Sequence, residues 1–107
     1  MFNELYCPVE ITAGIIGGKW KPLILFYLQD QTRRFGEIQK LLPGVTKKML
    51  TQRLRELERD GIVHRKVFPE VPPKVEYSLT AFGETLRPIM VMLNEWGQKH
   101  MKRIEGR

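Results

Sequence analysis

The sequence predicts a mainly α-helical fold with one small β-hairpin. Four helical segments come first, and the tight turn Pro43-Gly44-Val45 separates the last two of them. Two segments rich in β-branched and aromatic residues follow at 62–68 and 75–79, joined by a short proline-rich connection. One long helical segment comes last. Two helices joined by a short turn and followed by a hairpin form a winged helix-turn-helix, here with additional N- and C-terminal helices.

The first two helices are predicted from their ends. Pro8 suits the first helical position, which places Cys7 at the N-cap, and Gly17-Gly18 ends the segment. The apolar residues of this helix share one face: Val9, Ala13 and Ile16. A second helix is expected to begin at Pro22 and to end at Leu28. Because it is apolar nearly all round, it is predicted to be the buried central helix.

The next two helices would form the helix-turn-helix. A connector at 32–34, with a short strand as the alternative, leads into a helix at 35–42. Thr46 is expected to cap the following helix, which runs to Asp60 and is stopped by Gly61. Apolar residues at offsets of four and three mark the inward sides of the two helices: Phe35, Ile38, Leu41 and Leu42 in the first, and Leu50, Leu54 and Leu57 in the second.

The hairpin tip at 69–74 contains three prolines and Glu70, which predicts a stiff wing with modest reach into a minor groove. Thr80 is expected to cap a last helix from Ala81 to about Ile104. Pro88 inside this helix predicts either a kink or the start of a new segment. The apolar side of the helix follows three-four spacing: Leu86, Ile89, Met90, Leu93, Trp96, His100, Met101 and Ile104.

Positive charge is concentrated in one third of the chain. The 107 residues suit a single domain, 1–107, with a formal net charge of +6. Between Arg33 and Lys66 lie ten basic and four acidic residues, an excess that equals the whole net charge. A basic excess on one segment is typical of a surface that binds nucleic acid.

The helix from Thr46 to Arg59 is the candidate recognition helix. Once its leucines turn inward, the outward side carries residue types that contact base edges or phosphates. Lys47, Lys48, Thr51 and Gln52 are predicted to read bases, and Arg55 to contact a base or a phosphate. Backbone N–H groups at Thr46 can hold a phosphate at the start of the helix. The alternative is a solvated helix face, which the turn before it and the hairpin after it disfavour.

The flanks of this helix offer further contacts to double-stranded DNA. Arg65, Lys66 and Lys74 on the wing are predicted to contact phosphates, which set register rather than sequence, and Arg34 is a further flanking candidate. The alternative for each wing residue is packing within the hairpin alone.

Several other function classes find no support in the residues. No apolar run approaches the length that spans a bilayer, and residues 1–10 lack the pattern of a signal peptide. With a single cysteine, the chain fits a cytoplasmic protein. No metal site, cofactor or catalytic arrangement is expected, since His64 and His100 are far apart in sequence. Residues 104–107 resemble a factor Xa processing site, and they are either a natural tail or a remnant of processing.

The chain resembles the HxlR-type family of bacterial winged helix-turn-helix regulators, which is related to the MarR-like group. The resemblance covers about residues 6–103 and rests on five segments and one glycine: CPVE (7–10), IGGKWKPLIL (16–25), RFGEI (34–38), KMLTQRLREL (48–57), PPKVEYSLT (72–80) and Gly83. It implies a transcription regulator, often a repressor, that binds palindromic operators as a homodimer. It also implies that the first and last helices form the interface, with these candidates: Val9, Leu86, Ile89, Met90, Leu93, Trp96 and Met101.

Cys7 has two interpretations. Some members of this family sense oxidants or electrophiles with a cysteine at the matching Cys-Pro position, and the positive end of a helix favours the reactive thiolate. The alternative is a small residue packed at the dimer interface. Because the chain has no second cysteine, a disulfide would have to be intermolecular, or the adduct would be with a small molecule.

One different function remains open at this point, a winged helix that binds another protein and no specific DNA. It predicts a partner whose binding is insensitive to salt, whereas the localised charge favours a DNA-binding regulator.

Overall fold

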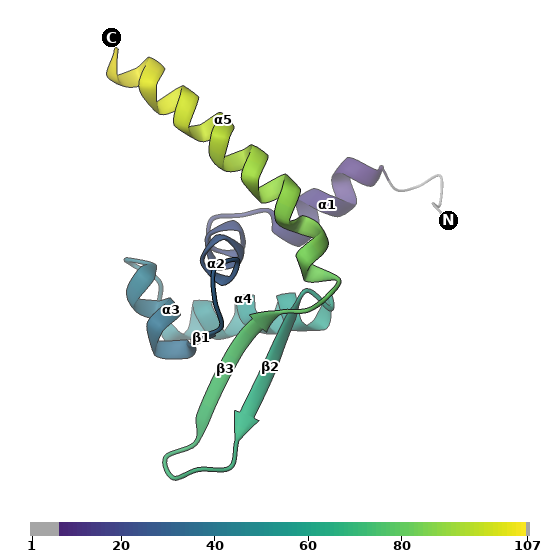
Figure 1. The fold of residues 1–107 in the computed structure, drawn as a ribbon, viewed down its shortest axis with the longest axis vertical. Coiled ribbons are helices and arrows are strands. Elements are labelled where there is room, and N and C mark those ends of the chain that lie inside the picture. Colours follow the sequence, from purple (N-terminus) through teal and green to yellow (C-terminus); the bar gives the residue numbers. More distant parts are fainter. Residues whose placement is uncertain (1–6, 107) are drawn as a thin grey trace.

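The computed structural model describes residues 7–106. The order of elements is α1 (Pro8–Ile16), α2 (Trp20–Leu28), β1 (Arg33–Arg34), α3 (Phe35–Leu41), α4 (Lys47–Arg59), β2 (Val63–Phe68), β3 (Lys74–Leu79), the 3-10 helix η1 (Gly83–Leu86) and α5 (Arg87–Glu105). The strands form one antiparallel sheet in the order β1-β3-β2. Figure 1 shows the β2–β3 hairpin projecting to one side and α5 leading away to the other. The predicted winged helix-turn-helix fold is confirmed. The single-domain prediction also covers 1–6 and 107, which lie outside the described residues.

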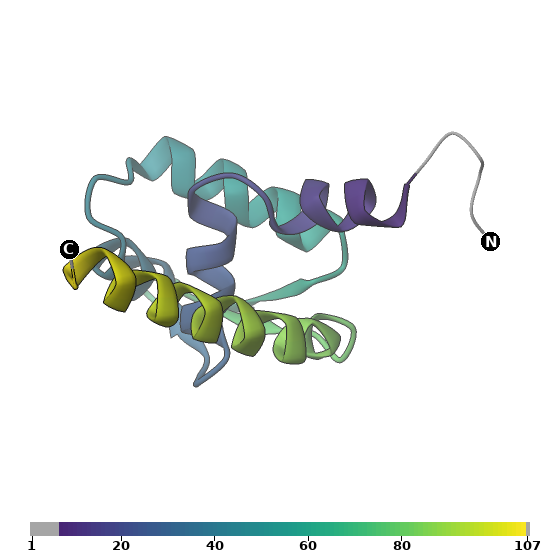
Figure 2. The ribbon, with the colours of Figure 1, turned by 90° about the horizontal axis from the view of Figure 1, so that it is seen from above.

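The core lies around α2. Seen from above, α2 stands between α4 and α5, and it packs on both (Figure 2). Ile24, Leu25 and Leu28 of α2 are buried against the inward leucines of α4 and against residues of α3, β2 and β3. The predicted inward sides are therefore confirmed for the three leucines of α4 and for Phe35, Ile38 and Leu42 at α3, whereas Leu41 is only half-buried.

Helix α2 differs from its prediction in two ways. It begins at Trp20, two residues before Pro22, because a proline in the first turn loses only an N–H that has no helical partner there. It is also not buried all round, since Leu23 and Phe26 are exposed. Trp20 and Lys21 are buried instead, so the start of this helix belongs to the core.

The ends of α4 agree with the sequence. The Thr46 hydroxyl accepts a hydrogen bond from the Met49 N–H at 3.1 Å and caps the helix. Asp60 is the C-cap, and Gly61 follows with φ +76°, a left-handed conformation that glycine adopts without strain. These two local signals fix the length of α4.

The last helix does not begin at Ala81 as predicted. The Thr80 hydroxyl accepts a hydrogen bond at 2.9 Å from the N–H of Gly83, the first residue of the short η1, while Phe82 is the N-cap residue of η1. Helix α5 begins at Arg87 with Pro88 in its first turn, where a proline is tolerated. Of the two alternatives for Pro88, the start of a new segment is correct. Within residues 7–106, no helix is both long enough and apolar enough to cross a membrane.

Candidate nucleic-acid interface

The outward side of α4 forms a shallow groove. Five of the predicted contact residues line it together: Lys47, Lys48, Thr51, Gln52 and Arg55. Glu56 and Arg59, which were not among the candidates, extend it toward the end of the helix. The groove exists because the leucines of α4 fill the core on the opposite side. A continuous row of long basic and polar side chains therefore faces outward.

The start of α4 has backbone donors available for an anion. The first four N–H groups of a helix have no partner within it. Here the Thr46 hydroxyl accepts a hydrogen bond from the Met49 N–H, and the Leu50 N–H donates to the Thr46 carbonyl at 2.9 Å. The N–H groups of Lys47 and Lys48 precede these, at the positive end of the helix dipole. This end can hold a phosphate beside two lysine side chains.

A second hollow joins α4 to the wing. Arg65 of β2 lines it with Thr51 and Arg55 of α4, and buried Tyr77 also contributes to it. Arg65 lies opposite Tyr77 in the β2–β3 register, so both share the face of the hairpin that turns toward the core. The structure thus brings Arg65 beside the predicted recognition helix.

Lys66 and Lys74 lie on the other face of the hairpin. Strand alternation separates Lys66 from Arg65, and the register puts Lys74 opposite Phe68. The two ammonium groups lie 4.9 and 4.8 Å from the centre of the Phe68 ring, and Lys74 Nζ is 3.3 Å from Glu76 Oε2. These contacts within the wing satisfy part of the lysine charge. The structure does not bring the three predicted wing residues together.

Arg34 lies near the wing tip. It lines a hollow with Glu70, Pro72 and Lys74, and its backbone N–H donates to Glu37 Oε1 at 2.8 Å. Its exposed side chain stands at the start of α3. This position fits the flanking contact that was predicted for it.

Some of the basic residues counted in the sequence serve the fold. Arg33 Nε donates to the Tyr27 carbonyl at 2.7 Å. Arg53 donates to the Glu56 carboxylate, and that hydrogen bond holds the pKa of Glu56 below its usual value although partial burial opposes the shift. Charge counting could not distinguish these arginines from those of the groove.

Exposed apolar side chains cover α1 and the outer part of α5. Val9 is 74% exposed and Trp96 is 69% exposed, and further exposed members of the predicted interface are Ile89, Leu93 and Met101. Leu86 is half-buried against the core. Met90 is only 5% exposed and packs in the core of its own chain, so it is removed from the interface candidates.

On α1 and α5 the sequence pattern missed three exposed apolar residues, Ile11, Val91 and Met92. None of them lies in the three-four stripe that defined the interface candidates, and only the tertiary structure shows that they remain uncovered.

Cys7 is at the predicted N-cap of α1. Its backbone is extended, with φ −84° and ψ 133°, and its thiol is free and exposed. Its carbonyl accepts from the Ile11 N–H at 3.1 Å. Val9, Thr12 and Ile16 line an apolar hollow on the same helix. Among the described residues, no group of three or more His, Cys, Asp and Glu side chains could hold a metal ion.

Comparison with known proteins identifies the family. Residues 15–105 match the profile of the HxlR-like helix-turn-helix family, which is most of the chain. The chain belongs to this family. It is therefore an HxlR-type helix-turn-helix transcription regulator.

Relatives of this HxlR-type regulator include YdeP of Bacillus subtilis strain 168, an uncharacterized HTH-type transcriptional regulator. The two are 57% identical over 99 residues, which cover 92% of this chain and 77% of YdeP. The relatives are transcriptional regulators, which gives indirect support for a protein that is not an enzyme. None of these comparisons favours the alternative of a module that only binds proteins.

Solved structures of two other regulators are similar. The redox regulator HypR in its reduced form has a TM-score of 0.89 at 50% identity, covering 94% of this chain and 100% of that one. The oxidized form of HypR has a TM-score of 0.84 at 55% identity, and the match covers 87% of this chain and 96% of HypR. Reduced YodB of Bacillus subtilis has a TM-score of 0.74 at 39% identity, and the match covers 88% of this chain and 93% of YodB. The HxlR-type regulator described here thus shares its fold with a regulator named for redox control.

Proposed function

We propose that this HxlR-type regulator binds a palindromic operator in the cytoplasm as a homodimer and acts as a repressor. Helix α4 of each subunit enters the major groove. The observation that carries this proposal is the groove along α4, in which all five predicted side chains lie together on one outward face. A helix of this kind fits the width of the major groove of B-DNA.

The roles of the groove residues follow from their chemistry. Recognition helices use their N-terminal part for base contacts, which assigns bases to Lys47, Lys48, Thr51 and Gln52. Lysine favours guanine edges, glutamine favours adenine, and a threonine methyl group contacts thymine. Arg55 and Arg65 border the hollow between helix and wing, where they suit the phosphates beside the groove.

Selection of bound sequences from a random DNA library tests this function. We expect an enriched palindrome whose half-sites are one helical turn apart, or a multiple of it. The affinity of the selected site should fall steeply between low and physiological salt, because several phosphates lose their counterions on binding. A protein that enriches no sequence, or whose binding ignores salt, would contradict the proposal.

The homodimer is proposed to form through α1 and α5. Their exposed apolar side chains are too many for a surface that faces water alone. Figure 1 shows the outer part of α5 leading away from α4. A two-fold axis through these helices would place two copies of α4 on one side of the DNA.

Cys7 is proposed as a redox switch of DNA binding. Its thiol is exposed at a helix N-cap, and HypR, which is similar over most of the chain, is described as a redox regulator. With diamide, two Cys7 thiols would give up two electrons and two protons to the reagent and form a disulfide between subunits. With a quinone, one thiolate would add to a ring C=C bond and form a carbon–sulfur bond, and the displaced electron pair would take up a proton from water to give a hydroquinone thioether.

Operator release after diamide or quinone treatment tests this role in the wild type and in Cys7→Ser. We expect release from the wild type, with a cross-linked dimer or a one-adduct mass shift, and none from the variant. Equal responses of the two proteins would remove Cys7 from the mechanism, and intact DNA binding by untreated Cys7→Ser is the control.

A further inference from the structure

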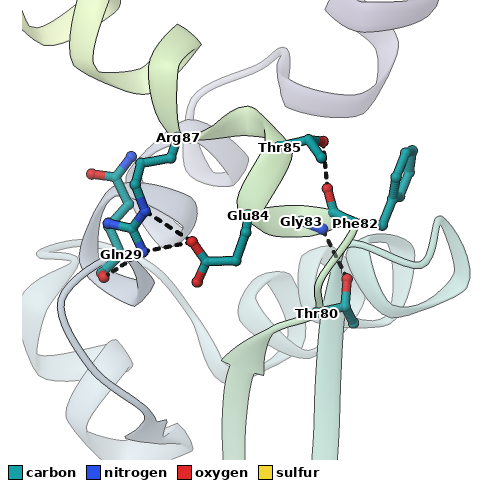
Figure 3. A network of polar contacts seen from close by, with 7 residues as sticks. All are labelled: Gln29, Thr80, Phe82, Gly83, Glu84, Thr85 and Arg87. Atoms are coloured by element: carbon teal, nitrogen blue, oxygen red, sulfur yellow. Dashed lines mark hydrogen bonds and ion pairs between the residues drawn. The ribbon is translucent and has the colours of Figure 1, made fainter.

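An arginine lies at the junction between the wing and α5. Arg87 is the first residue of α5. Its Nη2 donates to the carbonyl of Gln29 at 2.9 Å, and its Nε donates to Glu84 Oε2 at 2.8 Å (Figure 3). Gln29 is the C-cap of α2, 58 positions away in sequence. Arg87 therefore ties the base of α5 to the end of the central helix.

The contact between Arg87 and Gln29 has a defined orientation for two reasons. Carbonyls at the C-terminal end of a helix lack helical partners and carry partial negative charge, so a guanidinium there is favoured. Glu84 Oε2 also lies 2.7 Å from Arg87 Nη2, and this pairing orients the planar guanidinium toward Gln29. A guanidinium whose Nε and Nη2 both make hydrogen bonds has a fixed orientation, which sets the direction in which α5 leaves the domain.

Within residues 7–106, burial of α5 is confined to its base. Met90, one turn beyond Arg87, is buried in the core, and in the described part of the chain no residue of α5 after Met90 is buried. Figure 1 shows this outer part of the helix extending away from the other elements. Arg87 and Met90 together thus attach the base of α5, and the long exposed part of the helix after Met90 acts as a lever on this attachment.

The lever is long enough to matter for DNA spacing. From Met90 to the end of α5, a helix of this length measures about 22 Å. A change of about 10° at its base displaces its far end by about 4 Å, given the helical rise of 1.5 Å per residue. One base-pair step of B-DNA is about 3.4 Å. A small change at the junction therefore corresponds to a shift of one base pair between two recognition helices.

We propose that Arg87 is a positioning residue that sets the half-site spacing of the operator. It does so by fixing the angle between α5 and the helix-turn-helix through Gln29 and Glu84. This role rests on the proposed homodimer through α5. Arg87 does not line the α4 groove, so its effect is on spacing and not on the sequence of each half-site.

Binding to operators whose half-sites are moved apart or together by one base pair tests the role. The test compares the wild type with Arg87→Met, which keeps the apolar stem and removes both hydrogen bonds. We expect the wild type to prefer one spacing by about tenfold, comparable to the effect of one mismatched base pair. In Arg87→Met this preference should fall to about threefold or its optimum should move, while the dimer and the affinity for a single half-site are unchanged.

Lys102→Met is the matched control, because Lys102 is an exposed basic residue near the far end of α5. It should keep the wild-type spacing profile. Glu84→Gln removes only the orienting charge and should give an intermediate profile, which keeps the test valid if Arg87→Met folds poorly. An unchanged spacing profile in a dimeric Arg87→Met or Glu84→Gln would overturn the role of Arg87. A monomeric wild type without any spacing preference would instead overturn the proposed dimer, and with it this role.

Discussion

Lys21 Nζ lies 3.8 Å from Glu56 Oε1 and joins α2 to α4. Lys21 is only 9% exposed, and its ammonium group also donates to the Gly14 carbonyl of α1 at 3.4 Å. A single buried cation therefore contacts three helices. One of these, α1, has Cys7 as its N-cap, and another, α4, carries the candidate DNA contacts. Glu56 itself is anchored by Arg53, one turn away on α4.

Glu56→Gln is expected to lower stability at neutral pH by at most about 1 kcal/mol, because the carboxylate is partly exposed and water screens the pair. The Arg53 hydrogen bond lowers the pKa of Glu56 below 4.5, so the stabilisation is complete above that pH and is lost as the pH falls through the folded-state pKa. Thermal unfolding from neutral pH to about pH 2 should show the two proteins converging in acid. Glu58→Gln controls for the loss of one charge, and a pH-independent difference would contradict the prediction.

Gly83→Ala is expected to destabilise the protein by about 1–3 kcal/mol through overpacking. A Cβ at Gly83 would lie 2.2 Å from the carbonyl oxygen of Ile62, a backbone atom that cannot rotate away. Urea unfolding measures the effect. Gly36→Ala in α3 is the control, since a Cβ there meets nothing within 4 Å and should leave stability equal or slightly higher.

Replacing Lys47, Lys48 and Gln52 by alanine is expected to abolish specific operator binding without unfolding, because all three side chains lie on the outward side of α4. The matched control replaces Gln98, Lys99 and Lys102 of α5, which removes the same residue types far from the groove. Competition binding with selected and scrambled DNA separates specific from nonspecific affinity. Unchanged operator affinity of the α4 variant would refute its assignment as the recognition helix.

Arg65→Ala and Lys66→Ala should differ although the residues are neighbours. Arg65 faces the hollow beside α4, so its loss should weaken binding to all sequences and reduce the slope of log affinity against log salt by about 1. Lys66 lies on the other face over Phe68, and its loss should change the slope less. Salt titrations of the two variants measure these slopes. Equal slopes would contradict the prediction that the wing face beside α4 makes more of the phosphate contacts than the other face.

Trp96→Glu is expected to weaken the dimer at least tenfold, because it places a charge in the middle of the apolar surface of α5, where burial of an unpaired charge is costly. Sedimentation equilibrium measures the dissociation constant. Gln98→Glu introduces the same charge on the same helix, two residues away from Trp96 and outside its apolar stripe, and should leave the dimer intact. A Trp96→Glu variant that remains as dimeric as the control would place the interface elsewhere.

Local sequence signals determined much of this protein. Thr46 and Gly61 mark the two ends of α4, because capping and left-handed turns depend on a few adjacent residues. The three-residue and four-residue offsets of its leucines fixed which side faces the core, and with it the residues of the groove. These features follow from the geometry of a single helix.

Tertiary packing decided the rest. Alternation along β2 separates Arg65 from Lys66, but only packing of the sheet on α4 decides which of them faces the hollow beside α4. Met90 and Trp96 belong to the same apolar stripe, yet Met90 is buried in the core and Trp96 is 69% exposed. The three-four spacing of apolar residues on α5 is the same in the core and in the proposed interface, since both need apolar side chains. Only the positions of the neighbouring elements distinguish the part that the chain covers itself from the part that it leaves exposed.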